Sequence, residues 1–281
     1  MIMIMSKSKE DRLVTVARKL RARVIQMSHD GQAPHLGSAL SCIDILVAAY
    51  FAALRIDPAA PNAVDRDRFI LSKGHAASAL YATLAERGFF DTELLASYNS
   101  AGSALPEQPS PGALPGVEVA TGSLGHGLPL GLGMALAGRV QQRAFRVVVV
   151  LSDGECNEGS VWEAAMLAAA QTLDNVTVIV DYNRWQATGR SEEIMAIHPM
   201  VEKWKAFGWS AVEIDGHDFD QLVTGLENVP RVAGKPTALI ARTVKGKGVS
   251  FMEDDNNWHY RIPSADELRD AVAELMPDQH V

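Results

Sequence analysis

The segment VVVVLSDGECNEGSVWEAAMLAAAQTLDNVTVIVDYN, residues 147–183, has the pattern of a strand, a turn, a helix and a second strand. Its first five residues are apolar without alternation, as expected for a strand buried on both faces, and the strand ends just before Asp153. Residues 158–171 have helical spacing, and a β-branched run at 176–180 ends just before Asn183. If the two strands are parallel neighbours joined by a right-handed crossover, Asp153 and Asn183 emerge at the same edge of a sheet.

The same alternation continues along the chain and predicts the fold class. Further strand patterns occur at 69–71, 209–214 and 237–242, and helical patterns occur at 9–29, 40–54, 75–87 and 127–143. We therefore expect an α/β fold with a doubly wound parallel sheet and helices on both faces. Residues 99–120 are rich in Pro, Gly and Ser and long for a passive connection, which favours a functional loop.

Length and composition exclude several classes of protein. At 281 residues the chain has the size of one large α/β domain, and we expect residues 1–281 to form it. A net charge of −8 gives no long-range attraction for nucleic acid or anionic lipid. The sequence has no run of about twenty uncharged apolar residues, so no membrane span is predicted. We expect a cytoplasmic location. Cys42 and Cys156 are the two cysteines, too few for a disulfide framework.

Asp153 and Asn183 together predict a metal site. Mg²⁺ prefers one or two hard oxygen ligands from the protein, with phosphate oxygens and waters completing the shell. The simpler alternative makes Asp153 a helix amino-terminal cap, but that role says nothing about Asn183. Asp153 and Asn183 at one edge of the sheet therefore suit a metal ion that coordinates a diphosphate. We expect Asp153 to be exposed at this edge, outside the core.

The text around these residues resembles a known family. The pattern [GS]-D-G, then Asn 30 positions after the Asp (183 − 153), resembles the thiamine diphosphate signature, and DGECNEGSVWEAA with VIVDYNRWQ is similar to transketolases. The resemblance extends over nearly the whole chain, through LSKGHAASALY (71–81), GVEVATGSLGHGL (116–128) and KGKGVSFMEDDNNWHY (245–260). It implies thiamine diphosphate and Mg²⁺ as cofactors, with Ca²⁺ or Mn²⁺ as possible substitutes.

The resemblance also implies an activity and a partner. Transketolases have three successive domains, and this chain resembles only the first, the diphosphate-binding domain. It therefore resembles the amino-terminal subunit of a split transketolase, a transferase that passes a two-carbon ketol unit from a ketose or its phosphate to an aldose or its phosphate. The implied partner is a carboxyl-terminal subunit with the pyrimidine-binding domain, in an α2β2 heterotetramer. The alternatives are another thiamine diphosphate enzyme, such as a deoxyxylulose phosphate synthase-like or 2-oxo acid-decarboxylating one, and a non-catalytic Mg-nucleotide-binding or structural α/β module.

Site residues follow from the motifs that match. The implied metal ligands are Asp153, Asn183 and the carbonyl of Trp185. The implied cofactor contacts are His75, Gly122, Ser123, Leu124, Gly154, Glu155, Asn183 and His259. The implied sugar contacts are His35, Gln108 and His259, and the catalytic groups are His35, His259 and Glu158. The resemblance also implies that Glu158 and Glu163 belong to a relay at the subunit interface. The plainer roles for these residue types are positive-φ glycines, capping or surface histidines and acidic residues at a helix amino terminus.

Three departures from the family pattern surround the predicted sugar side. Gln108 stands where a histidine is usual, and glutamine hydrogen bonds but does not titrate. The sequence Pro34-His35-Leu36 replaces His-Pro after a glycine, and Tyr260 follows His259 where glycine is common. The lysines of the KGKG segment (245–248) and the charged residues 66–68 are attributed to surface charge.

Overall fold

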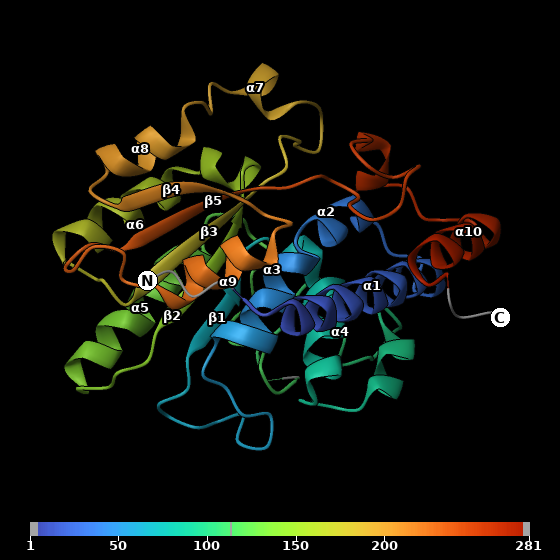
Figure 1. Cartoon of the computed structure of the whole chain (residues 1–281), viewed down its shortest axis with the longest axis horizontal. Helices are drawn as coiled ribbons and strands as arrows, with labels where there is room; N and C mark the ends of the chain where they lie inside the picture. The colour runs from blue at the N-terminus through green and yellow to red at the C-terminus, as the bar shows by residue number, and fades with distance from the viewer. Residues whose placement is uncertain (1–4, 113, 278–281) are drawn as a thin grey trace.

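The computed structural model describes residues 5–112 and 114–277. Its centre is a five-stranded sheet in the order β1-β2-β3-β5-β4, with every neighbouring pair parallel (Figure 1). The strands are β1 (Arg68–Leu71), β2 (Val147–Ser152), β3 (Val176–Tyr182), β4 (Ser210–Asp215) and β5 (Thr237–Arg242). This order confirms the doubly wound parallel sheet, because the chain moves outward from β1 to β4 and then returns to insert β5.

Ten α-helices are found in the described residues. They are α1 (Lys7–Asp30), α2 (Leu36–Ser41), α3 (Ile43–Ala48), α4 (Ala77–Arg87), α5 (Gly127–Val140), α6 (Gly159–Ala170), α7 (Ser191–Ile194), α8 (Met200–Ala206), α9 (Phe219–Glu227) and α10 (Ala265–Leu275). Single turns of other helix types occur at Ala49–Ala53, Gly74–Ala76, Thr92–Ser97, Gly154–Asn157 and Asn256–His259. Within the described ranges, none of these helices is both long and apolar enough to span a bilayer.

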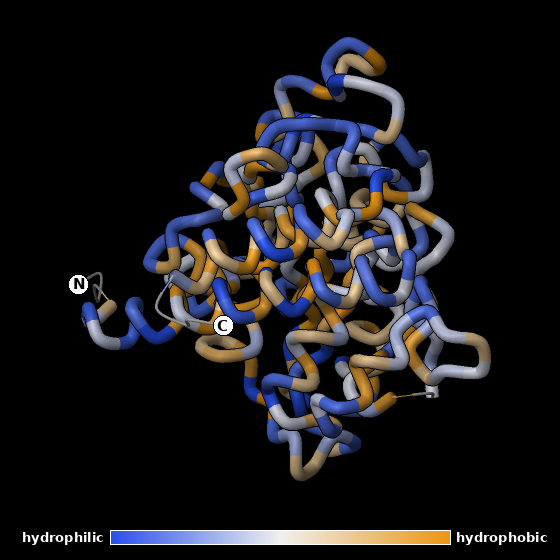
Figure 2. Tube along the Cα trace, turned by 90° about the vertical axis from the view of Figure 1, so that its right-hand side faces the viewer, coloured by the Kyte–Doolittle hydropathy of each residue, from blue (hydrophilic) through white to orange (hydrophobic). Residues whose placement is uncertain are grey.

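Two apolar cores lie on opposite faces of the sheet. Val148 and Val150 of β2 pack into the core that contains residues of α1, α3, α4 and α9, whereas Val147 and Val149 pack into the core formed with α5, α6 and α8. Because both faces are covered, the strand residues are apolar without alternation. Figure 2 shows the same arrangement, with apolar segments gathered inside the molecule and polar segments around them.

The parallel register brings the carboxyl ends of four strands to one edge. Ser152 pairs with Asp181, and Tyr182 pairs with Arg242, so the segments that follow β2, β3 and β5 start side by side. The end of β1 joins them, because Leu71 pairs with Val150. Residues far apart in the sequence can therefore meet here.

The helix expected over 40–54 is wrong in its boundaries. It begins earlier, at Leu36, because His35 adopts φ 70° and turns the chain into α2. It is also interrupted at Cys42, where φ and ψ are −99° and 3°. Ser41, just before this break, donates a hydrogen bond of 2.6 Å to the carboxylate of Asp181. The interruption therefore lies where the helix side chains turn toward the carboxyl edge of β3.

Candidate active site

The loop after β2 presents a buried carboxylate. Asp153 has an exposed fraction of 0%, so the expectation of an exposed position is wrong. Its Oδ1 accepts a hydrogen bond of 2.9 Å from the Gly154 amide, and its Oδ2 accepts one of 2.8 Å from Ser191 Oγ. The correction has a physical reason: the segment after β3, including α7, folds back over the strand end and covers it. Burial raises the pKa of Asp153 to about 7.

The turn after β3 is shaped around Asp153. Arg184 adopts φ 65°, a left-handed conformation that is costly for a residue with a side chain. This turn lets the Arg184 amide donate to Asp153 Oδ2 over 2.9 Å and the Trp185 amide donate to Asn183 Oδ1 over 3.0 Å. Asp153 and Asn183 are therefore neighbours. Strain of this kind is typical of functional sites.

The Trp185 carbonyl is available as a ligand. In the described part of the chain, no hydrogen-bond donor reaches its oxygen. The side chain is fixed from the other side, because the indole donates to Asp254 Oδ1 over 2.8 Å and the guanidinium of Arg190 lies 3.7 Å from the ring centroid. One carboxylate, one amide oxygen and one backbone carbonyl thus come from two adjacent loops.

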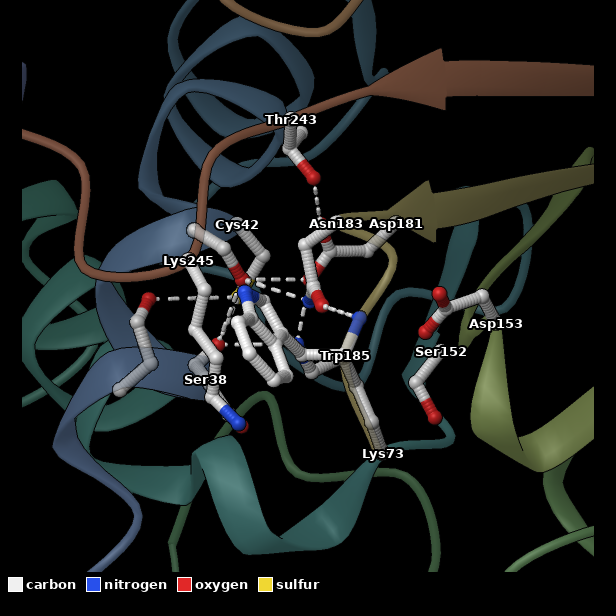
Figure 3. Close-up of polar contacts among 12 residues, drawn as sticks. Ser38, Cys42, Lys73, Ser152, Asp153, Asp181, Asn183, Trp185, Thr243 and Lys245 are labelled. Atoms are coloured by element: carbon white, nitrogen blue, oxygen red, sulfur yellow. Dashed lines mark hydrogen bonds and ion pairs between the residues drawn. The ribbon is translucent and has the colours of Figure 1, made fainter. Parts of the chain in front are cut away.

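A buried ion pair lies beside Asn183 (Figure 3). Lys73, from the loop after β1, pairs with Asp181 of β3, and both side chains have an exposed fraction of 0%. Ser41 and Thr243 also donate to Asp181, from α2 and from the end of β5. Burial alone would raise the pKa of Asp181, but the Lys73 ammonium holds this pKa below its usual value. The sequence analysis assigned neither residue to the site.

Three histidines that are distant in the sequence have their rings close together, and they line the same pocket as Lys73. The ring centroid of His35 lies 5.4 Å from that of His75 and 5.0 Å from that of His259, and His75 and His259 are 5.9 Å apart. The His35 amide donates to the His259 carbonyl over 2.7 Å, which ties the α2 start to the Asn256–His259 turn. Burial, then the Lys73 charge, holds the pKa of His75 well below its usual value.

The histidines border a pocket of about 410 Å³. Its wall includes Lys73, Gln108, Asn183 and Gln186. Gln108 Oε1 and Gln186 Nε2 are buried and lack a hydrogen-bond partner among the described residues. His35 Nδ1 lies 2.9 Å from Glu107 Oε1, an ion-pair distance that falls short of hydrogen-bond geometry. Because unpartnered buried polar atoms are costly, this wall is built to contact a polar ligand.

The glycine-rich loop before α5 lies against the loop after β1. A Cβ on Gly74 would lie 2.4 Å from the carbonyl oxygen of Thr121, so these backbones approach more closely than any side chain permits. Gly122 and Leu124 line the pocket, whereas Ser123 is exposed outside it.

The side chain of Glu155, an implied cofactor contact, is turned toward the loops after β1 and before α5. Its buried carboxylate accepts from Ser72 and, over 2.8 Å, from the Gly125 amide, and it does not line the pocket. The side chain therefore ties the glycine-rich loop to the loop after β2. Glu158 lines the pocket rim, and both Glu158 and Glu163 are exposed in the single chain.

Two attributions to surface charge are wrong. Lys245 has an exposed fraction of 1%, because its side chain turns inward toward His259. Asp67 has an exposed fraction of 0%, because Arg55 and Arg146 surround its carboxylate at the amino end of β1.

The residues present fit a magnesium diphosphate group. Within the described ranges no group of three or more His, Cys, Asp or Glu side chains could hold a metal alone. A site with one carboxylate and two neutral oxygens leaves positions for phosphate oxygens, as Mg²⁺ prefers. The buried carboxylate of Asp153 and the free carbonyl of Trp185 are the observations that support this fit.

Comparisons with known proteins agree with this geometry. Residues 9–278 match the family described as transketolase, thiamine diphosphate binding domain. The chain is 40% identical over 259 residues to one of the subunits of apulose-4-phosphate transketolase from Phocaeicola vulgatus, and the match covers 92% of each chain. It is 41% identical over 241 residues to the SqwG subunit of 6-deoxy-6-sulfo-D-fructose transketolase from a Clostridium species, covering 86% of this chain and 88% of the relative.

Solved structures give the same result. Transketolase from Leishmania mexicana superposes with a TM-score of 0.88 at 26% identity over 95% of this chain, and transketolase from Campylobacter jejuni superposes with 0.88 at 27% identity over 96%. The chain spans 42% and 43% of the lengths of those two proteins.

Proposed function

The chain belongs to the transketolase family, whose thiamine diphosphate-binding domain it matches, and we propose that it is the diphosphate-binding subunit of a split transketolase. The observation that carries the proposal is the meeting of Asn183 and three histidines around one pocket, with Asp153 held next to Asn183 by its hydrogen bond from the Arg184 amide. The reaction proposed is transfer of a two-carbon ketol unit from a ketose, or its phosphate, to an aldose or its phosphate.

Asp153, Asn183 and the Trp185 carbonyl would hold Mg²⁺ with the cofactor diphosphate. The half-buried His75 and the glycine-rich loop would lie against the cofactor, because both border the pocket beside this metal site. When bound, thiamine diphosphate supplies the electron sink for breaking a carbon–carbon bond next to a carbonyl. The protein contributes binding, orientation and electrostatics.

His35, His259 and Gln108 would face the sugar. His35 has Glu107 beside its Nδ1, and the unpartnered Gln108 amide oxygen lies in the same pocket. A polyhydroxylated ligand offers many donors and acceptors for such groups. Tyr260 adds a ring 4.7 Å from that of His259 and 5.9 Å from that of His35, and so narrows this side.

The relatives support a ketose donor without fixing it. One relative is named for apulose 4-phosphate and another for 6-deoxy-6-sulfo-D-fructose. The proposed substrate class is therefore ketoses that carry a phosphate or another anionic group, and the individual sugar is a matter for assay.

A second polypeptide would complete the site. Both relatives are named as subunits, and the solved transketolases are more than twice as long as this chain. An apolar surface on α5 and α6 supports association, since Leu130, Met166 and Leu167 have exposed fractions of 43%, 53% and 45%. The proposed partner carries the pyrimidine-binding domain, in an α2β2 assembly.

The test is reconstitution with a candidate partner, thiamine diphosphate and Mg²⁺. Two-carbon transfer from a panel that includes apulose 4-phosphate and 6-deoxy-6-sulfo-D-fructose supports the proposal. Carbon dioxide release from a 2-oxo acid would instead favour a decarboxylating thiamine enzyme. Failure of the assembled protein to bind thiamine diphosphate would favour a non-catalytic module.

A further inference from the structure

Lys245 is buried directly behind His259. Its Nζ lies 2.7 Å from Asn256 Oδ1 and 3.0 Å from His259 Nδ1. The lysine comes from the loop after β5, and the other two residues come from the turn at Asn256–His259. The contact therefore joins two segments of the site.

The direction of the Lys245 side chain is fixed by its surroundings. Its stem crosses Gly37, where a Cβ would lie 3.1 Å from Lys245 Cγ. On either side, the Gly246 amide donates to the Gly37 carbonyl over 3.0 Å and the Asp254 amide donates to the Lys245 carbonyl over 2.8 Å. These contacts restrain the Lys245 backbone and stem, and so they fix the position of the ammonium beside His259.

The chemistry of this contact sets the proton on the imidazole. An ammonium has three N–H donors and no lone pair, so a hydrogen bond to it requires His259 Nδ1 to accept. Burial and then the charge of Lys73 lower the pKa of Lys245 to about 8, which leaves the amine mostly charged at neutral pH. Burial and then the Lys245 charge lower the pKa of His259 to about 3, and His35 and Lys73 act in the same direction. The ring is neutral, and its one proton is on Nε2.

We propose that Lys245 is a positioning residue that holds His259 in the neutral form with its proton on Nε2, so that this imidazole offers a hydrogen-bond donor to an oxygen bound in the pocket. His259 is then unsuited to accept a proton from a sugar hydroxyl, which revises the role suggested by ordinary histidine titration. Naming the bound oxygen as one of a sugar rests on the proposed function, whereas the state of the ring does not.

His35 provides an internal contrast. Glu107 Oε1 is 2.9 Å from its Nδ1, an ion-pair distance without hydrogen-bond geometry, and the negative charge of this carboxylate favours a proton on the nearer nitrogen, Nδ1, which leaves a free lone pair on Nε2. Two imidazoles whose centroids are 5.0 Å apart are therefore expected to have opposite tautomers, one backed by an ammonium and the other by a carboxylate. A pocket with one donor and one acceptor suits a substrate that exchanges a proton.

The experiment uses the full chain labelled with ¹⁵N-histidine, without cofactor or partner. Long-range ¹H–¹⁵N correlation spectra at pH 7 report which ring nitrogen is protonated, and the signals are assigned by their loss in His259→Gln and His35→Gln. We expect the Nε2–H form for His259 and the Nδ1–H form for His35. An Nδ1–H form of His259 in the unsubstituted chain would overturn the proposal without any variant of Lys245.

Variants then test the cause. Lys245→Met removes the donor, and we expect His259 to become a mixture of tautomers with a raised pKa. Lys245→Arg retains a permanent charge and donors, and should keep the Nε2–H form. Asn256→Ala is the matched control, since it removes the other partner of Nζ, together with the hydrogen bond of 3.2 Å from Asn256 Nδ2 to the Ala187 carbonyl, and leaves the Lys245 contact with His259. An unchanged His259 signature in a folded Lys245→Met chain contradicts the proposal.

A kinetic arm separates this inference from the proposed function. In the assembled enzyme, Lys245→Met should lower kcat/KM for ketose donors by about tenfold or more, as for loss of one preorganised donor. Lys245→Arg should retain most of this kcat/KM, because it keeps a charged donor beside His259 Nδ1. If the assembly shows no two-carbon transfer, the proposed function fails while the tautomer result stands on its own.

Discussion

Lys73 and Asp181 form an ion pair that is fully buried beside the turn at Asn183, with both side chains at 0% exposure. The pair ties the loop after β1 to the end of β3, two residues before Asn183. Lys73 also donates to the Ser38 carbonyl over 2.8 Å, which attaches α2 to the same point. The position of the Asn183 turn therefore depends on a lysine from another strand.

Removing one partner should be strongly destabilising. We expect Lys73→Met to lower the free energy of unfolding by about 3–5 kcal/mol, because Asp181 is left as a buried carboxylate without its counter-charge. Urea unfolding of the two chains measures the difference. The control replaces both members, Lys73→Met with Asp181→Leu, and should recover most of the loss. A single-variant loss below about 1 kcal/mol would show that solvent reaches the pair.

The sequence predicted the sheet and the convergence at its edge because these follow from short-range patterns. Continuous apolar runs mark strands covered on both faces, and parallel neighbours end at the same edge. Asp153 and Asn183 were found by this logic. Asp181 and Lys73 have the same signals, a charge within or just after an apolar strand, and could have been found from them.

The rest depends on tertiary contacts that no local pattern encodes. Lys245 and Asp67 resemble surface charges in the sequence, yet each is buried because residues from distant elements provide partners. The exposure of Asp153 was mispredicted for the same reason: Ser191, 38 positions away, covers it. The break at Cys42 likewise lies beside a contact between distant segments, the hydrogen bond from Ser41 to Asp181 of β3.

The Asp67 cluster should make stability depend on pH. Burial would raise the pKa of Asp67, but hydrogen bonds from Arg55 and Arg146 hold it below its usual value. A depressed carboxyl pKa contributes stability that is present above the unfolded value of about 3.9 and is lost as pH falls through the folded value. Asp67→Asn should therefore destabilise strongly at pH 7 and progressively less below about pH 4.

Urea unfolding at pH 7, 5, 4 and 3 checks this dependence. The matched control is Asp65→Asn, two residues earlier, whose exposed carboxylate pairs with Arg143 and should change stability by less than about 1 kcal/mol. A difference between Asp67→Asn and the unsubstituted chain that grows toward acid would reverse the expected sign.

Asp153→Asn should abolish metal-dependent cofactor binding while keeping the fold. Asparagine keeps one of the two acceptor oxygens and avoids a cavity, whereas alanine would leave the donors of Gly154, Arg184 and Ser191 all unpaired, at about 1–3 kcal/mol each. Titration calorimetry with thiamine diphosphate and Mg²⁺ on the assembled enzyme measures the loss, with Asp65→Asn as the control. Unchanged affinity with Mg²⁺ would remove Asp153 from the metal site.

Gln108→His should alter donor choice more than cofactor affinity. The Gln108 amide oxygen is unpartnered among the described residues, and a Cβ on Gly122 would lie 2.7 Å from it, so this side chain lies against the glycine-rich loop in the pocket that the three histidines border. We expect the ratios of kcat/KM among ketose donors to change several-fold. A uniform drop in kcat/KM for all donors, together with weaker thiamine diphosphate binding, would show that the Gln108 side chain contacts the cofactor and not the donor.

The final prediction concerns assembly: the chain alone should lack two-carbon transfer and gain it with its partner. Two relatives are named as subunits, and the chain spans 42% and 43% of the lengths of the two solved transketolases, which supports a second polypeptide in the proposed enzyme. The apolar surface on α5 and α6 supplies the test, because a charge buried in an interface is costly. Met166→Glu should weaken association by tenfold or more, about 1.4 kcal/mol, and leave the Tm of the single chain unchanged.

Light scattering and an activity titration with the partner measure this effect. Val64→Glu is the matched control, since Val64 has an exposed fraction of 56%, close to the 53% of Met166, but lies in the segment before β1. That variant should assemble normally, so a loss confined to Met166→Glu identifies the α5 and α6 surface and not a general effect of added charge. Equal losses of association in both variants would argue against this surface as the interface. Full two-carbon transfer by the isolated chain would refute the split-enzyme proposal, whether or not the metal site is confirmed.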